Sequence, residues 1–99
     1  MSATLFPSAA ETAALSETVD LRRGHIHASG RLTRAGADLL RGTADSLRVS
    51  GHSHVVLDLR DIRGADAAGL AILDHLQRRF AASGDSLLIR HAPEGDHRP

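Results

Sequence analysis

The sequence predicts an α/β domain, in which a small mixed β-sheet carries helices packed on it in the order β-β-α-β-α-β. Four short stretches show the apolar alternation or the apolar runs typical of strands, and two longer stretches repeat apolar residues at helical spacing. Each helical stretch lies between two strands, which therefore pair in parallel, whereas the first two strands are close enough for an antiparallel hairpin. A chain of 99 residues has room for one such domain.

The N-terminal part of the chain leads into two strands. Residues 1–16 are rich in Ala, Ser and Thr, and we expect an N-terminal tail or a short helix, for which Ser8–Glu11 supplies a capping box. Residues 18–22 are expected to form a short strand, and residues 25–29 alternate polar and apolar side chains as a half-buried strand does. The Arg23-Gly24 dipeptide between them predicts a tight turn.

The middle of the chain predicts a helix and then a buried strand. Thr33 is a candidate N-cap for a helix over residues 35–49. The apolar stripe of this helix comprises Ala37, Leu40, Ala44 and Leu47. Residues 54–59 form an apolar run with two valines, which is typical of a central strand that is covered by other elements.

The C-terminal part repeats this arrangement. We expect residues 60–65 to form a connection, after which Asp66 caps a second helix over residues 67–83. Gly84 is suited to end that helix, and residues 86–90 are expected to form the last strand.

The composition excludes several classes of function. Twelve cations balance twelve anions, and aromatic residues make up 2%, so neither bulk charge nor base stacking favours binding of nucleic acid. Cysteine is absent, which excludes disulfides, thiol catalysis and Cys-based zinc sites. The apolar runs are too short for a membrane span, and the N-terminus lacks the pattern of a secretory signal. We therefore expect a cytoplasmic protein, with a core built from Leu, Ile and Val.

The most informative stretch joins the buried strand to the second helix. This helix opens with Asp66-Ala67-Ala68-Gly69-Leu70, in which small residues precede a leucine. Open α/β sheets bind their partners where the carboxyl ends of strands lie beside helix N-termini. The stretch resembles the STAS domain family, the anti-sigma factor antagonists, in which an aliphatic strand is followed by Asp, a serine pair or a variant of it, Gly and Leu. The family's earlier glycine corresponds to Gly30, and the resemblance covers residues 19–91.

The resemblance implies a STAS-like domain over residues 17–92, followed by a polar C-terminal tail over residues 93–99. In the family, a kinase phosphorylates the second serine of the pair, and the unphosphorylated antagonist binds this anti-sigma factor kinase and releases the sigma factor. Here Ala68 occupies the phosphoacceptor position and Ala67 that of the first serine, so the switch is lost. We expect a non-enzymatic module without a cofactor that regulates transcription by binding an anti-sigma factor of the histidine-kinase-like ATPase class, or another regulatory protein.

The expected partner-binding surface lies at the start of the second helix and comprises Arg63, Asp66, Ala67, Ala68, Gly69 and Leu70. One alternative is that the small residues only let the helix pack closely on the sheet. Another keeps the family but makes the chain a STAS subunit that docks on the ATPase of a lipid-transport ABC system, because residues 66–71 are also close to the motif of that branch. The family usually continues beyond the last strand expected here, so we also expect exposed apolar surface and a homodimer as one way to cover it.

Seven histidines raise a third alternative, a metal-dependent enzyme. His25 and His27 are two residues apart, as are His52 and His54, and side chains at this spacing share one face of a strand. No cysteine or close carboxylate completes either pair, so we expect no metal site. A catalytic serine is not expected either, because the nucleophile elbow G-x-S-x-G is absent.

Three carboxylates, Asp58, Asp61 and Asp66, cluster around the end of the buried strand and are a weaker candidate for a cation site. Asp66 is better explained as a helix cap. Asp58 and Asp61 are expected to pair with nearby arginines or with backbone amides.

Overall fold

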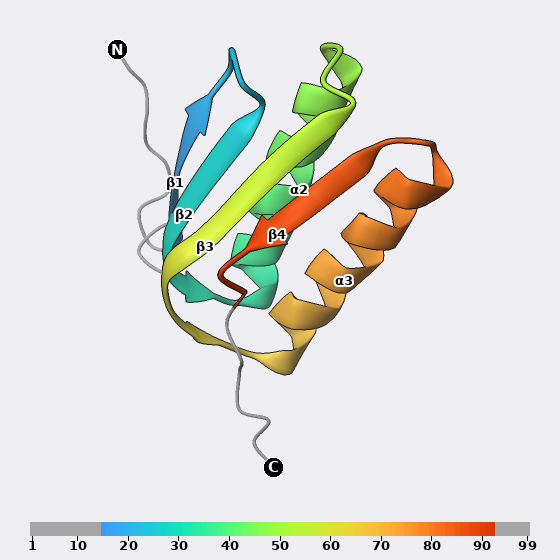
Figure 1. The fold of residues 1–99 in the computed structure, drawn as a ribbon. Helices are drawn as coiled ribbons and strands as arrows, with labels where there is room; N and C mark the ends of the chain where they lie inside the picture. The colour runs from blue at the N-terminus through green and yellow to red at the C-terminus, as the bar shows by residue number, and fades with distance from the viewer. Residues whose placement is uncertain (1–14, 93–99) are drawn as a thin grey trace.

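The computed structural model describes residues 15–92 as a four-stranded sheet with two helices on one of its faces (Figure 1). The expected mixed sheet and element order are confirmed. The elements are β1 (Leu15–Asp20), β2 (His25–Leu32), α2 (Arg34–Val49), β3 (His54–Ala65), α3 (Ala67–Ala82) and β4 (Ser86–Arg90). The expected N-terminal tail or helix lies mostly, and the polar C-terminal tail entirely, outside the described residues. None of the helices within residues 15–92 has the length and apolar character needed to cross a membrane.

The strands lie in sequence order, β1-β2-β3-β4. β1 and β2 pair as an antiparallel hairpin, and Gly24 allows its turn with a φ of 71° while its N–H donates to the Asp20 carbonyl at 2.9 Å. β2 pairs with β3, and β3 with β4, in parallel. Right-handed crossovers that advance in one direction along a sheet place their helices on the same face, which is the arrangement in Figure 1.

Both helices have the N-caps that the sequence predicts, and α3 begins at Ala67 as expected, whereas α2 begins at Arg34, one residue before the predicted start. The Thr33 hydroxyl accepts a hydrogen bond from the Gly36 N–H at 3.1 Å, and the Asp66 carboxylate accepts one from the Gly69 N–H at 2.8 Å. Each cap satisfies a backbone donor that the first turn of a helix leaves unpaired. α3 ends before Gly84, whose φ of 84° ends the helix without strain.

The core lies between the sheet and the two helices and contains only apolar side chains. Strand residues that alternate along the helix-covered face meet the apolar stripes of α2 and α3. The buried members are Leu15, Ile26, Ala28, Leu32, Ala37, Leu40, Ala44, Leu47, Val55, Leu57, Leu59, Leu73, Leu76, Phe80 and Leu87. No polar or charged residue among residues 15–92 is fully buried. The core within residues 15–92 therefore depends on aliphatic packing, with Phe80 as the single aromatic member from this range.

Four predicted strand boundaries are wrong. β1 ends at Asp20 rather than at residue 22, and β2 continues to Leu32 rather than ending at residue 29. β1 begins at Leu15 rather than at residue 18, because Leu15 and Ser16 pair with Gly30 and Ser29 of a longer β2. β3 continues to Ala65, so residues 60–65 are strand and not a connection. The partner of this extension is again the longer β2, and pairing continues to Leu32 opposite Ala65.

Candidate functional site at the start of helix α3

The start of α3 is fixed against the connection between β2 and α2. The Asp66 N–H donates to the Leu32 carbonyl at 3.1 Å, which ties the end of β3 to the end of β2. Gly69 is buried on the inner side of the first helical turn. A Cβ atom at this position would lie 2.7 Å from the Leu32 carbonyl oxygen and 3.0 Å from that of Thr33. Gly69 therefore serves close packing, as the alternative interpretation expects.

The two alanines that precede Gly69 do not share this packing. Ala67 and Ala68 are both exposed, as are Arg63 and Asp66, and Leu70 is half-buried. The six expected site residues thus divide into one packing glycine, one partly buried leucine and four that present atoms to solvent. The first turn of α3 supplies no hydroxyl group to the surface around Ala68, because residues 67–70 are Ala, Ala, Gly and Leu.

A β-bulge lies near the end of β3, shortly before α3 begins. Pairing between β2 and β3 passes from Gly30 opposite Ile62 to Arg31 opposite Gly64, which leaves Arg63 as the extra residue. Gly30 adopts a φ of 103° at this irregularity, which glycine tolerates better than other residues. Bulges commonly redirect a side chain next to a functional site. Here the bulge at Arg63 lies a few residues before Ala67, where the helix that carries Ala68 begins.

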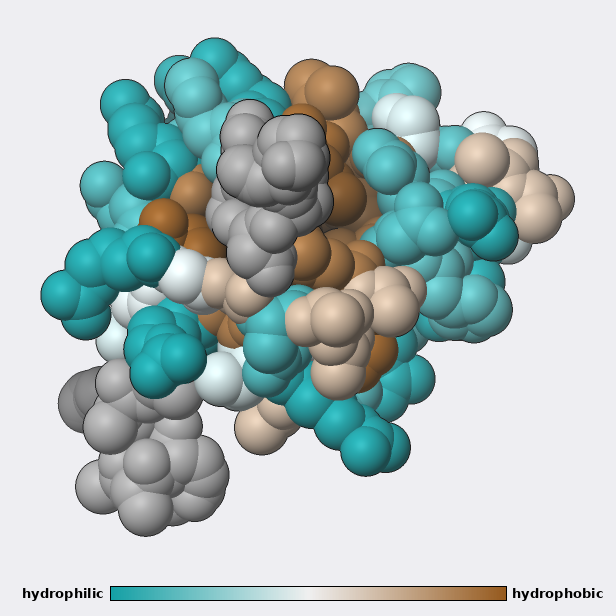
Figure 2. Space-filling view, turned by 90° about the horizontal axis from the view of Figure 1, so that it is seen from below, coloured by the Kyte–Doolittle hydropathy of each residue, from teal (hydrophilic) through white to brown (hydrophobic). Residues whose placement is uncertain are grey.

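Sequence reasoning missed two further arginines at the same end of the sheet. Arg31, Arg34 and Arg63, named the arginine rim below, are all exposed, and no ion pair within residues 15–92 involves any of them. Figure 2 views the molecule from this end and shows hydrophobic residues in the middle of the face with hydrophilic residues around them. Arg31 and Arg34 lie on either side of the Thr33 cap in the sequence. This position could have indicated them as site residues, because the parallel pairing of β2 and β3 brings the cap beside the start of α3.

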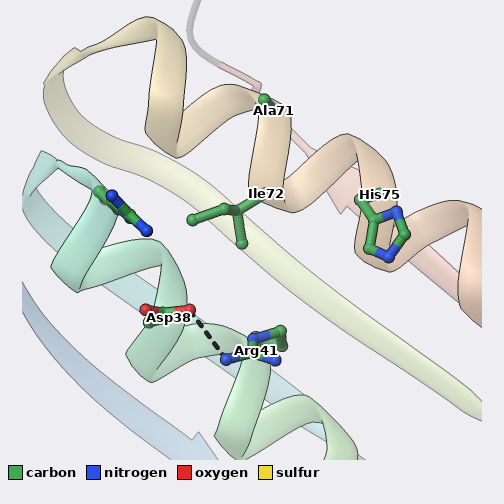
Figure 3. A pocket seen from close by; sticks show the side chains of 6 residues that line it. Asp38, Arg41, Ala71, Ile72 and His75 are labelled. Carbon is green, nitrogen blue, oxygen red and sulfur yellow. Dashed lines mark hydrogen bonds and ion pairs between the residues drawn. The ribbon is translucent and has the colours of Figure 1, made fainter.

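A groove also runs between the two helices close to this site (Figure 3). It has a volume of about 380 Å³ and is lined by Arg34, Asp38, Arg41, Ala71, Ile72 and His75. Ile72 points from α3 towards α2, and Asp38 pairs with Arg41 at 2.9 Å. The α2–α3 groove, as we call it, continues the exposed surface of Ala68 along the next two turns of α3.

Within residues 15–92 no group of three metal-ligating side chains converges, and His27, His52 and His54 contact different partners. The His27 Nε2 lies 2.7 Å from an Asp61 carboxylate oxygen, and the His54 Nδ1 lies 2.8 Å from the Ser86 hydroxyl. His52 precedes β3 and its Nε2 contacts the Leu21 carbonyl at 2.8 Å, so His52 and His54 do not share a strand face as predicted.

The three carboxylates near the end of β3 are also engaged separately. Asp58 accepts a hydrogen bond from the Arg60 N–H at 3.0 Å, and this bond, aided by the Arg60 guanidinium, lowers the pKa of the Asp58 carboxyl. Asp61 pairs with His27 rather than with an arginine, and Asp66 caps α3. They therefore do not form a shared cation site.

Comparisons with known proteins agree with this architecture. A sequence-family model described as "Mlab, STAS domain" matches residues 15–98, so the chain belongs to the STAS domain family. A solved structure titled "Crystal Structure Analysis of Mglu" is similar over 71% of this chain, with 26% sequence identity and a TM-score of 0.60. The matched part is 17% of that protein's chain, so this chain spans a small fraction of its length. The search of curated proteins gave no match.

Proposed function

We propose that the chain is a non-enzymatic docking module that acts as an anti-sigma factor antagonist without a phosphorylation switch. STAS domains generally mediate protein–protein interactions, and this chain belongs to that family. The observation that carries the proposal is the exposure of Ala67 and Ala68 at a well-capped helix start. The proposed docking surface comprises Arg63, Asp66, Ala67, Ala68, Gly69 and Leu70, in which Gly69 supports the surface from below.

The chemistry of position 68 determines how this module is regulated. A phosphate on a hydroxyl there adds about −1.5 to −2 charges at neutral pH and repels a complementary partner surface. Ala68 has no hydroxyl, so its partner binds regardless of kinase activity. The proposed partner is an anti-sigma factor of the histidine-kinase-like ATPase class, and the complex releases the sigma factor whether ATP is present or not.

Isothermal titration calorimetry tests this function: the purified chain is titrated with an anti-sigma factor of the histidine-kinase-like ATPase class, once with ATP and once without it. We expect equal affinity in both conditions. Ala68→Glu should weaken binding by about tenfold or more, because it places a charge in the docking surface. The substitution does not threaten folding, because a carboxylate in the first turn stabilises a helix by about 0.3–1 kcal/mol. Ala82→Glu, at an exposed position at the opposite end of α3, is the matched control.

Phosphorylation of Ala68→Ser provides a second test of the same surface. If the kinase still recognises this helix start, the variant should incorporate radiolabelled phosphate and then lose affinity for the kinase, whereas the parent chain should not be labelled. An unlabelled Ala68→Ser variant, together with unchanged binding of Ala68→Glu, would contradict the proposed surface.

The second candidate function is docking on the ATPase of a lipid-transport ABC system. The hydroxyl-free stretch over residues 66–71 favours it, because it is close to the motif of that branch. Titration of the chain against such an ATPase separates the two candidates, since each predicts binding to one ATPase class only. A homodimer is compatible with either, and analytical ultracentrifugation of the free chain measures it.

A further inference from the structure

The α2–α3 groove lies next to the proposed docking surface but is not part of it. Ala71 follows Ala68 by three residues on α3, and His75 follows Ala71 by four, so all three lie on one side of the helix. Arg34, Asp38 and Arg41 repeat at the same spacing on α2 and form the facing wall. The exposed surface at the start of α3 therefore continues directly into the groove.

The charged side chains of the groove are unequally balanced. Asp38, its only carboxylate, already pairs with Arg41 at 2.9 Å. Arg34 has no ion pair within the described part of the chain. The rest of the arginine rim, Arg31 and Arg63, is likewise exposed without an ion pair among these residues. Arg31, Arg34 and Arg63 thus bring three cations without ion pairs among residues 15–92 to this end, where the exposed Asp66 carboxylate caps α3.

The floor of the groove is apolar. Ile72 is half-buried and points between the two helices, where it packs on the core with one side and faces the groove with the other (Figure 3). A ligand that fits here needs carboxylates for Arg34 and its neighbours, which bind planar anions through paired N–H groups. It also needs an apolar side chain to cover Ile72.

We propose that the α2–α3 groove binds an acidic segment of the partner protein that carries apolar side chains between its carboxylates. This inference rests on the proposed docking function and extends it, because it specifies the chemistry of the partner and the path it takes. The segment crosses the arginine rim beside Ala68 and continues along α3 towards His75. Charge complementarity also explains why an anion at position 68 repels the partner, since the partner's own segment is acidic.

Selection of peptides that bind the chain from a displayed random library tests the proposal. Fluorescence anisotropy then measures the affinity of the selected peptides, called winners below, for the chain and its variants. We expect winners rich in Asp and Glu with interspersed Leu, Ile or Phe, and they should lose about tenfold or more in affinity for Arg34→Glu. This variant keeps α2 intact, because the first helical turn favours a carboxylate. Arg22→Glu is the matched control, since it makes the same change of charge at an exposed position in the β1–β2 turn.

Each other outcome overturns the inference. Basic or neutral winners, no winners, or winners that bind Arg34→Glu unchanged all contradict an acidic occupant. If the kinase complex weakens with Ala68→Glu but not with Arg34→Glu, the proposed function stands and the groove is excluded from it. If the free chain is a dimer that Arg34→Glu dissociates, the occupant is a second copy of the chain and not a partner segment.

Discussion

Gly69 determines how closely α3 approaches the sheet. Its missing side chain lets the helix start within contact of the Leu32 and Thr33 carbonyls, and the Asp66 cap is held in the same place by its bond to Leu32. The exposed alanines next to it keep their position only as long as this contact is kept. The packing interpretation therefore applies to Gly69, whereas docking is what we propose for the exposed residues beside it.

A glycine pair tests this contact. Gly69→Ala adds a methyl group that meets backbone atoms at 2.7 and 3.0 Å, so we expect a loss of about 1–3 kcal/mol in the free energy of unfolding. Gly42→Ala, in the exposed middle of α2 with nothing within 4 Å, should instead gain up to about 1 kcal/mol from helix propensity. Urea denaturation followed by circular dichroism measures both. Equal effects of the two substitutions would show that the close approach has no energetic consequence.

At the same scale, the sequence predicted what depends on neighbouring residues and missed what depends on register. Thr33, Asp66 and Gly84 were found because caps and helix ends are local signals. The contact of His27 with Asp61, 34 positions along the chain, was not found. It depends on a bulge that shifts β3 by one residue against β2, and a bulge has no signature in this sequence.

Among the elements, β1 is an edge strand of the sheet, and its contact with α2 contains the half-buried carboxylate of Glu17. The Thr43 hydroxyl of α2 donates to Glu17 Oε2 at 2.7 Å, while Glu17 Oε1 is buried without a hydrogen-bond partner among residues 15–92. Burial therefore raises the pKa of Glu17, and the bond from Thr43 partly offsets this effect. The sequence did not predict that β1 begins at Leu15. Leu15 and Glu17 face α2, but the polar residues around them in the sequence do not show the alternation that indicates a strand.

The raised pKa of Glu17 makes stability depend on pH. Between the ordinary glutamate pKa of 4.5 and the raised value, the folded state binds more protons than the unfolded state, so the free energy of unfolding falls as pH rises through this interval. We expect Glu17→Gln to remove this slope and to be more stable than the parent chain at pH 7. Thr43→Val removes the bond that lowers the pKa, so it should extend the slope to higher pH. Urea titrations over a pH series measure both, and a Glu17→Gln variant with an unchanged slope would contradict this account.

At the scale of the whole molecule, the two helices within residues 15–92 pack on one face of the sheet, so this part of the chain has a single thin core. The core was predicted as aliphatic from composition, and the fold from the alternation of strands and helices, because both are averages over many residues. Arg63 was predicted as a site residue, but Arg31, Arg34 and the α2–α3 groove were not, because their arrangement depends on how β2, α2 and α3 meet in space. A domain with so thin a core has a small free energy of unfolding, so the loss of one large buried side chain should destabilise it strongly.

Phe80 is the largest buried side chain and the strongest test of this thin core. Its ring is 1% exposed, and the Arg48 guanidinium lies 5.6 Å from its centroid while pairing with Asp85 at 3.9 Å and Asp45 at 3.7 Å. Phe80→Ala should cost about 3–5 kcal/mol, which is a large part of the about 5–15 kcal/mol expected for a whole domain. We therefore expect the variant to be partly unfolded at physiological temperature.

Val49→Ala, at a position 82% exposed, is the control and should change stability by less than about 0.5 kcal/mol. Far-UV circular dichroism is the appropriate probe, because the chain lacks Trp and Tyr. A Phe80→Ala variant as stable as Val49→Ala would mean that the ring contributes little to the core, and that the aliphatic layer between sheet and helices is sufficient without it.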